Sequence, residues 1–596
     1  METFEKLIFL LSPKERKHAG LLLILITIMA ILDMIGVASI LPFMTVLTNP
    51  SLIETNLILK NLFHASRVLG VSNNEQFLFA LGMLVFILLI LSLSFKAFTT
   101  YILIKFVQMR EYSIGKRLIE GYLYQPYRWY LNQNSADLGK NILSEIQQLI
   151  TSGMRPMMDL ISKGMIVFAL IILLILADPK LALTVGFIIG GAYILIYYFV
   201  KKYLNRIGKE RLHNNQLRFT SVSEAFGAIK EVKVGGLEQT YIKNFADSSK
   251  VFAQTQASST VIGQLPRFIL EAIAFGGILL IILYVMSKTG NFNNALPIIS
   301  LYVFTGYRLM PALQQIYVAF TRLTFIGISL DKLHNDIKNL KITKNDKDQK
   351  IMSFNKSIVL KNIYYNYPNS TRTALKNVNI KIDAKTIVGL VGATGSGKTT
   401  IVDIILGLLE TQKGSLEVDG KIINEHNLRS WQDSIGYVPQ NIFLADDSMA
   451  ANIAFGIMKK NINQEAVEKA SKIANLHDFV VDELSEKYQT KIGERGVRLS
   501  GGQRQRIGIA RALYHNPKIL IFDEATSALD NQTEKAVMDA VNNLRKDITI
   551  ILIAHRLNTV KRCDKVFFVD KGIIKNEGTF QELSNINENF FINVNS

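Results

Sequence analysis

Nine residues in the second half of the chain, GATGSGKTT (392–400), have types and spacing suited to holding an anion. They match G-x-x-x-x-G-K-[ST], follow the apolar run TIVGLV and precede the helix-like run TIVDIILGLL. Glycines let the backbone curl so that several N–H groups point at one anion, and the start of a helix adds a positive dipole end. We expect Lys398 to reach the β- and γ-phosphates of ATP and the Thr399 hydroxyl to hold Mg²⁺.

A second motif, which contains two acidic residues, is ILIFDE (519–524), where Asp523 lies 125 residues after Lys398. A buried strand that ends in a carboxylate can deliver it to a metal ion, so Asp523 is expected to bind Mg²⁺. Glu524 is then placed to polarise the attacking water as a general base. The loop residues expected to bind ATP are Gly392, Ala393, Thr394, Gly395, Ser396, Gly397, Lys398 and Thr399.

Between these motifs lies LSGGQRQR (499–506), and the complete ordered set resembles the ATP-binding cassette (ABC) transporters. The resemblance implies that Gln440 in YVPQ senses Mg²⁺ and the attacking water, and that His555 in IAHR contacts the γ-phosphate. It also implies that Tyr367 stacks on adenine, that SALD (527–530) is the D-loop, and that IGERG (492–496) contacts the membrane domain. Ala384 departs from the family pattern, which has a glycine there, but every catalytic position is filled.

The first half of the chain differs in character from the half that carries these motifs, because it contains long apolar runs. Spanning helices need about 20 apolar residues, and we expect six spans, at about 19–48, 76–106, 157–177, 180–200, 262–287 and 295–325. Basic residues cluster where alternating helices would return to one side, and the positive-inside rule makes that side cytoplasmic, with both termini. The net charge of +18 therefore has a membrane explanation, and we expect no nucleic-acid partner.

The predicted fold is an all-α transmembrane domain (1–338), a polar linker (339–350) and an α/β nucleotide-binding domain (351–596). Residues 106–156 and 201–261 are too polar for lipid but have helical periodicity, which predicts long cytoplasmic extensions. Breaks near 132–142 and 223–236 could place short helices crosswise against another domain. An amphipathic helix at about 51–70 could lie at the outer membrane surface or pack on neighbouring spans.

Six spans before one cassette resemble a half-size exporter, and the family arrangement then requires a dimer. The resemblance implies that the signature residues of one chain close over the ATP held by the other: Ser500, Gly501, Gly502 and Gln503. Because only one cassette is found, a homodimer is the simplest assembly. We expect a multi-pass protein of the bacterial inner membrane with its cassette in the cytoplasm.

Charges inside spans usually face a cavity or a partner, so they are candidates for substrate contact. Arg308, Gln315 and Arg322 are spaced by sevens and form one stripe, which suits an anionic head group. Alternatively, Arg267 and Glu271, four apart, neutralise each other, and Arg322 lies in the cytoplasm. The candidate substrate residues are Lys96, Arg267, Arg308 and Arg322.

Three stretches of the membrane half, PRFILEA (266–272), YRLMPAL (307–313) and the outer helix, resemble bacterial lipid-linked oligosaccharide flippases (PglK type). That resemblance implies an anionic, polyprenyl-pyrophosphate-linked substrate moved from the inner to the outer leaflet. Exporters of drugs, other lipids or peptides remain alternatives, as does an ATP-gated channel or sensor without active transport. An intact Glu524 favours turnover and therefore transport.

Overall fold

The computed structural model describes residues 2–67, 70–289, 292–340, 351–368, 370–493, 496–524, 531–543, 547–553 and 560–586. It divides into two compact units, residues 1–125 with 133–342, and residues 126–132 with 343–596. The change from one unit to the other falls inside the stretch 339–350 that the sequence assigned to a linker. Most of that stretch lies outside the described residues.

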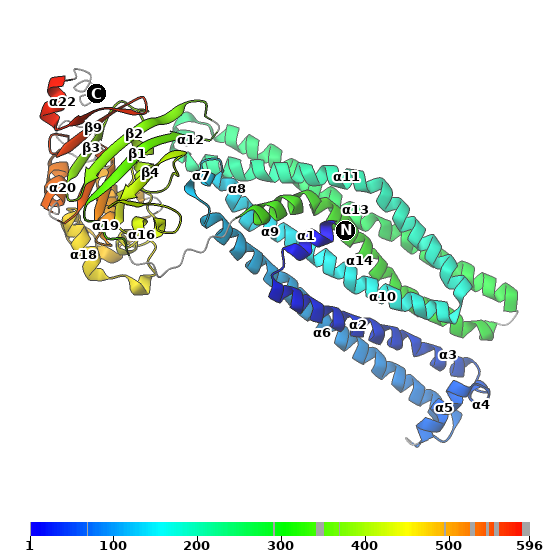
Figure 1. Ribbon diagram of the computed structural model, residues 1–596. Helices are drawn as coiled ribbons and strands as arrows, with labels where there is room; N and C mark the ends of the chain where they lie inside the picture. Colours follow the sequence, from blue (N-terminus) through cyan, green and yellow to red (C-terminus); the bar gives the residue numbers. More distant parts are fainter. Residues whose placement is uncertain are drawn as a thin grey trace. The chain divides into compact units, whose positions relative to one another are not determined.

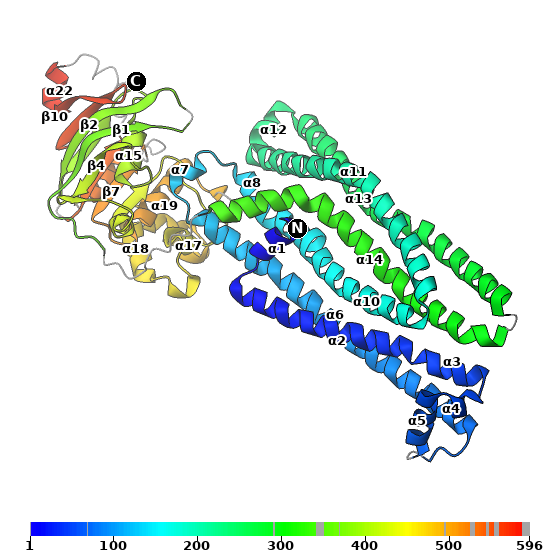
Figure 2. The ribbon, with the colours of Figure 1, turned by 45° about the vertical axis from the view of Figure 1, so that its right-hand side comes forward.

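Unit 1 is a bundle of long helices that run side by side (Figures 1 and 2). Its helices are α1 (Glu2–Phe9), α2 (Pro13–Ala38), α3 (Ile40–Thr48), α4 (Leu52–Thr55), α5 (Leu57–Ser66), α6 (Asn74–Leu123), α8 (Ser135–Lys140), α9 (Ile146–Leu149), α10 (Arg155–Ala177), α11 (Pro179–Gly227), α12 (Ile229–Gly235), α13 (Glu238–Thr289) and α14 (Phe292–Asn339). Local chemistry explains several boundaries. Ser12 and Glu15 form a capping box at the start of α2, and the Asn73 side chain caps α6.

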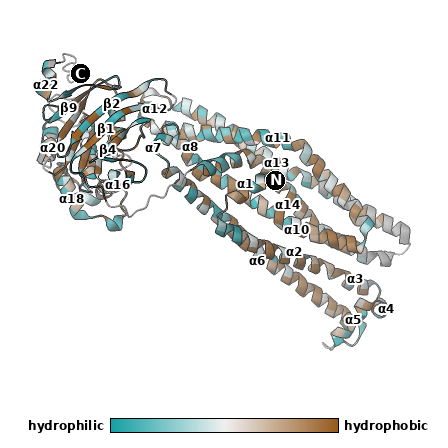
Figure 3. Ribbon diagram, viewed as in Figure 1, coloured by the Kyte–Doolittle hydropathy of each residue, from teal (hydrophilic) through white to brown (hydrophobic). Residues whose placement is uncertain are grey.

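Among the described residues, four helical stretches are long and apolar enough to cross a membrane: Pro13–Thr48, Asn74–Leu123, Ser135–Ala177 and Ala182–Gly227. They contain the first three predicted spans and all but the first two residues of the fourth, 180–200. The other two predicted spans, 262–287 and 295–325, fall within the helices α13 and α14. Figure 3 shows hydrophobic residues gathered toward the end of the bundle that carries α3 and hydrophilic residues toward the end that carries α12. The prediction of long polar helical extensions is therefore confirmed.

The helices of unit 1 are interrupted where the sequence indicated breaks, with small shifts. The first break precedes α8 and contains the four-residue helix α7 (Tyr127–Tyr130), which belongs to unit 2. The second contains α12, which ends at Gly236 in the left-handed conformation that favours glycine. Two π-helical turns, Asn141–Glu145 and Ile150–Met154, lie between α8 and α10, and the sequence analysis did not foresee them.

The predicted outer helix is two short helices, α4 and α5. Leu59 is buried in a cluster with Val46 of α3 and with Phe77 and Leu81 of α6. The ring of Phe63 meets Phe77 edge-on, with 5.1 Å between centroids. The sequence allowed this segment either to lie at the membrane surface or to pack on neighbouring spans. These contacts support packing on neighbouring spans. Residues 68–69 of the predicted outer helix lie outside the described residues.

Unit 2 contains two sheets. Four antiparallel strands run in the order β2-β1-β4-β5, and six strands run in the order β10-β9-β3-β8-β7-β6. The pairs from β9 to β6 are parallel, as the alternating pattern predicted. The strands are β1 (Ser357–Asn366), β2 (Thr373–Asp383), β3 (Ile387–Val391), β4 (Lys413–Val418), β5 (Lys421–Ile422), β6 (Ile435–Val438), β7 (Ile519–Asp523), β8 (Thr549–Ile553), β9 (Lys565–Asp570) and β10 (Ile573–Gly578).

The central strands β3, β7 and β8 are buried at every position, which explains their continuous apolar sequences. The helices of unit 2 are α7, α15 (Lys398–Ile405), α16 (Leu428–Gln432), α17 (Met449–Ile453), α18 (Gln464–Ile473), α19 (Gly501–Leu513), α20 (Asn531–Asn543) and α22 (Phe580–Ile586). Because parallel strands end at one edge, the segments that follow β3, β6 and β7 meet there. Ligands bind at this edge in open α/β sheets.

Candidate functional site

The phosphate loop joins β3 to α15 and has the backbone that its glycines were expected to supply. Gly392, Gly395 and Gly397 all have positive φ. A Cβ atom on Gly392 would lie 2.1 Å from the carbonyl oxygen of Val569, so only glycine fits there. The loop is thus a close-fitting curl of backbone at the start of a helix.

The polar side chains of this loop suit an anionic ligand. Lys398 is buried and its Nζ donates hydrogen bonds to the carbonyl oxygens of Gly392 (2.7 Å) and Ala393 (3.0 Å). Burial lowers the pKa of Lys398, against the opposing influence of Glu524 and Asp523. The buried Ser396 Oγ has no hydrogen-bond partner among the described residues. Thr399 is exposed, so its hydroxyl is available to a metal ion.

Two of the three predicted catalytic groups, Gln440 and Glu524, lie together beyond the ends of β6 and β7. Gln440 Nε2 donates a hydrogen bond to Glu524 Oε2 at 2.7 Å. Asp523 is buried, and its Oδ2 accepts a hydrogen bond from the Tyr437 hydroxyl at 3.3 Å. Glu524 has φ +51°, a left-handed conformation that costs about 1–2 kcal/mol for a non-glycine residue. Such local strain is concentrated at functional sites.

A group of tyrosines and a further carboxyl lies beside α15. The Tyr367 hydroxyl is 3.1 Å from Thr400 Oγ1, and its ring meets that of Tyr365 edge-on. Burial, with Asp523 adding to it, raises the pKa of Asp403 to about 6. The sequence analysis missed Asp403 and Tyr437. The signal was present: Asp403 is a lone acid on the first apolar helix after the phosphate loop.

The signature residues are placed at a helix start. Ser500 and Gln503 form a capping box for α19: Gln503 N–H donates to Ser500 Oγ (3.1 Å) and Ser500 N–H donates to Gln503 Oε1 (2.8 Å). Gly501 and Gly502 form the first turn. Within the described ranges, no hydrogen bond joins these residues to the phosphate loop of the same chain. His555, the D-loop 527–530, and residues 494–495 of IGERG lie outside the described residues.

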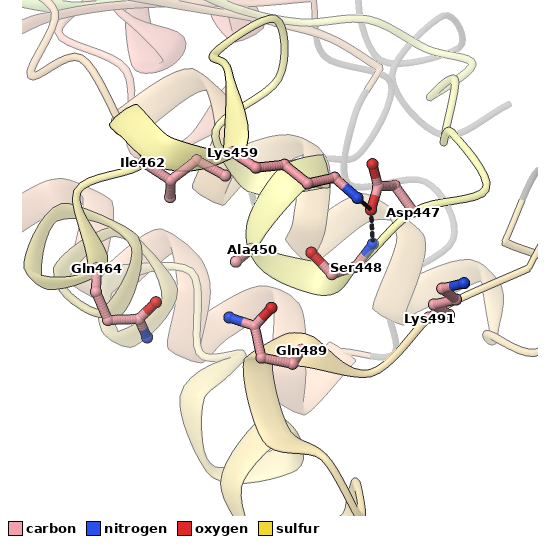
Figure 4. A pocket seen from close by; sticks show the side chains of 8 residues that line it. All are labelled: Asp447, Ser448, Ala450, Lys459, Ile462, Gln464, Gln489 and Lys491. Carbon is pink, nitrogen blue, oxygen red and sulfur yellow. Dashed lines mark hydrogen bonds and ion pairs between the residues drawn. The ribbon is translucent and has the colours of Figure 1, made fainter.

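Unit 2 also has a hollow of about 250 Å³ that contains no predicted site residue (Figure 4). Lys459 and Lys491 contribute to its lining. Lys459 Nζ pairs with Asp447 Oδ1 at 2.8 Å, and Asp447 accepts a second hydrogen bond from the Ser448 N–H. The carboxylate of Asp447 and the ammonium of Lys459 neutralise each other. We therefore assign this hollow no part in nucleotide binding.

The charged candidates in unit 1 fall into three places. Lys96 and Arg308 both pair with the fully buried carboxylate of Asp33, Lys96 at 3.5 Å. Arg267 pairs with Glu271 at 2.6 Å, and both side chains are exposed. The mutual neutralisation offered as an alternative is therefore the arrangement found for Arg267.

Arg322 lies at a different place, a cavity of about 490 Å³ between α6, α10 and α14. Gln315 shares this cavity, so two members of the predicted stripe line one cavity while the third pairs with Asp33. The other polar residues of the lining were not among the sequence candidates: Thr100, Arg155, Asp159, Ser162, Lys163 and Gln314. Charges within the otherwise apolar run 157–177 were the available signal.

Comparisons with known proteins agree with this architecture. Residues 19–308 match the family model "ABC transporter transmembrane region", and residues 375–527 match "ABC transporter". The chain is 31% identical over 485 residues to an ATP-dependent lipid A-core flippase of Saccharophagus degradans, covering 79% of each protein. It is 29% identical over 483 residues to the protein of the same name from Escherichia coli K12, covering 79% of this chain and 80% of that protein.

A solved structure of a bacterial Atm1-family ABC exporter with ATP bound has the same fold. It is 21% identical in sequence, with a TM-score of 0.76, and the match covers 95% of this chain and 98% of that one. A bundle of membrane-spanning helices joined to one ATP-binding cassette defines a half-transporter of the exporter class. The chain belongs to the ABC transporter family, and it is a multi-pass membrane ATPase that couples hydrolysis to the movement of substances across the membrane.

Proposed function

We propose that this transporter moves a polyprenyl-pyrophosphate-linked oligosaccharide from the inner to the outer leaflet of the bacterial inner membrane. The observation that carries the proposal is the excess of cations among the charged side chains of the Asp33 group and of the cavity between α6, α10 and α14. Five cations, Lys96, Arg155, Lys163, Arg308 and Arg322, stand against two carboxylates, Asp33 and Asp159. Charges within spans are costly unless they meet a partner, and a pyrophosphate is a partner of the required sign.

The two polar regions are electrostatic neighbours. Lys163 of the cavity is an electrostatic neighbour of Lys96, which pairs with Asp33. Asp159 likewise interacts with Arg155, Lys163 and Arg322. An anionic head group in the cavity would therefore meet cations of α10 and α14, with Lys96 of α6 as a neighbour of Lys163, while an apolar tail could remain in lipid.

A second lipid substrate is favoured by the relatives. The similar proteins from Saccharophagus degradans and Escherichia coli are named lipid A-core flippases. This supports lipid flipping as the class of activity. The resemblance of 266–272 and 307–313 to the oligosaccharide flippases is our reason for preferring the pyrophosphate-linked glycan.

The ATP site supplies the driving reaction in this proposal. Lys398 and the loop N–H groups would hold the phosphates, and Tyr367 would contact adenine. Glu524, held by Gln440, would accept the proton of the attacking water. Thr399, Asp523 and Gln440 would hold Mg²⁺, which would neutralise charge on the phosphates.

We further propose that the transporter is a homodimer. Its cassettes would be cytoplasmic, and each signature motif would act on the ATP of the partner. Ser500 is exposed, and among the described residues no hydrogen bond joins it to its own phosphate loop, which supports action in trans. His555 is proposed to contact the γ-phosphate on family grounds alone.

The decisive experiment is ATP hydrolysis by the purified protein in liposomes, with and without a polyprenyl-pyrophosphate glycan. We expect the glycolipid to stimulate hydrolysis in the wild type and to be translocated, with Glu524→Gln as the inactive control. Lys163→Met should weaken the response, whereas Arg267→Ala, at an exposed and paired residue, should retain it. Stimulation by unrelated drugs but not by the glycolipid would exclude the proposed substrate.

A further inference from the structure

Asp33 holds two cations that come from distant parts of the chain. Its side chain, on α2, is 1% exposed, and it pairs with Lys96 of α6 and Arg308 of α14. Ser92 Oγ, one helical turn before Lys96, donates a third contact at 3.3 Å. A Cβ atom on Gly36 would lie 3.6 Å from the Ser92 Cβ, so α2 and α6 approach closely beside this contact. The carboxylate is therefore fixed by packing.

The two cations are less confined than the carboxylate. The side chains of Lys96 and Arg308 are 29% and 14% exposed, and together they have more N–H donors than the roughly four acceptor sites of one carboxylate. The group of three keeps a net charge of +1. Lys163 of the neighbouring cavity adds a further cation close to Lys96.

Without Asp33, Lys96 and Arg308 would repel each other in a poorly solvated site and would separate. With Asp33, they converge on one point and still have donors and charge to offer. We propose that Asp33 is a positioning residue that brings Lys96 and Arg308 together so that both bind one phosphate of the substrate head group. The inference rests on the proposed function and assigns the organising residue of its binding site.

Neutralising Asp33 is expected to change the affinity for the anion in the direction opposite to the one that net charge alone would give. Removal of a negative charge near an anion site should, by Coulomb attraction alone, tighten anion binding. If Asp33 acts by positioning, its neutralisation should instead weaken binding. The other carboxylate of the region, Asp159, is the matched comparison, since it lines the cavity but pairs with neither Lys96 nor Arg308.

The test uses the full-length protein in nanodiscs of uncharged lipid, with farnesyl pyrophosphate as the probe. The half-maximal concentration for stimulation of ATP hydrolysis and the maximal stimulated rate are measured separately. We expect Asp33→Asn to raise the half-maximal concentration about tenfold while the maximal rate changes less than about threefold. Asp33→Glu should recover most of the loss, and Asp159→Asn should not weaken binding.

A double-mutant cycle separates positioning from general damage. If Asp33 acts through Lys96, the effect of Asp33→Asn should shrink at least about threefold in the Lys96→Met background. Additive effects, or a half-maximal concentration that is unchanged or lower in Asp33→Asn, would overturn the inference. If Asp33→Asn does not fold, Ser92→Ala takes its place, and an unchanged half-maximal concentration then overturns it. A wild type that ignores farnesyl pyrophosphate would defeat the proposed function itself, and the inference with it.

Discussion

At the scale of single residues, Glu524 combines a strained backbone with a short contact to Gln440. Glutamine has the same shape as glutamate but cannot accept a proton from water. We expect Glu524→Gln to bind ATP normally and to lower its hydrolysis about 10²–10⁴-fold, the usual contribution of a general base. Nucleotide binding by equilibrium titration and turnover by phosphate release would be compared in the same preparation.

Lys398→Ala is the matched comparison for that substitution, because Lys398 belongs to the binding loop rather than to the acidic strand. It should lose ATP binding as well as hydrolysis. Normal turnover by Glu524→Gln would refute the assignment of the base and would direct attention to another acid of the site.

The geometry of the phosphate loop was predictable because it depends on local sequence. A strand, six loop residues and a helix fix the phosphate cradle within about 20 residues of chain. The partners of Lys96 and Arg308 were not predictable in this way. Asp33 meets them only when three helices pack, and no spacing in the sequence encodes that meeting. The sequence identified charges within spans but could not pair them.

At the scale of elements, the π-helical turn Asn141–Glu145 ends in a buried ion pair. Glu145 and Arg211 of α11 each have side chains 1% exposed. Asn215 Nδ2 donates to Glu145 at 2.7 Å, and Arg211 donates to Ser329 of α14 at 2.8 Å. Helical periodicity predicted the helices here but not this turn. A π-helical turn contains one residue more than an α-helical turn, and the types of its residues do not reveal the extra one.

Removal of one partner should cost more than removal of both. Glu145→Gln leaves Arg211 as a buried and uncompensated cation, a loss of about 3–5 kcal/mol in comparable pairs. The double variant Glu145→Leu, Arg211→Met replaces the pair with apolar side chains and should recover part of the lost stability. Thermal unfolding in detergent checks the order of the midpoints. A double variant less stable than Glu145→Gln would contradict it.

Another element-scale contact joins β4 to the segment that enters β1. Asp419 accepts backbone N–H hydrogen bonds from Asn355 (2.8 Å), Lys356 (2.8 Å) and Ser357 (2.9 Å). Burial opposes the charged form, but these three donors outweigh it and lower the pKa of the Asp419 carboxyl. A lowered pKa in the folded state stabilises the fold above the unfolded pKa, and this stability is lost as the pH falls through the folded pKa.

Asp419→Asn is a suitable probe, because asparagine tolerates the positive φ at this position. We expect it to lower the midpoint of cassette unfolding by about 2–4 °C at pH 7. The difference from the wild type should shrink as the pH falls below about 4, where the unfolded carboxyl is protonated. Differential scanning fluorimetry across pH 7 to 3.5 measures it. A difference that grows on acidification would reverse the sign of the argument.

At the scale of the whole molecule, the proposed homodimer makes each ATP site from two chains, with Lys398 from one and Ser500 from the other. A chain with Lys398→Ala and a chain with Ser500→Arg are then each inactive as homodimers. Their heterodimer has one site with both changes and one site with neither, so we expect up to about half of the wild-type hydrolysis.

The heterodimer is isolated after co-expression by giving each chain a different affinity tag and purifying on the two tags in sequence. If each chain built its own site, no site would be intact, and the heterodimer would be as inactive as its parents. Pairing the Lys398→Ala chain with a chain carrying both substitutions provides the control, since no intact site can form under either arrangement.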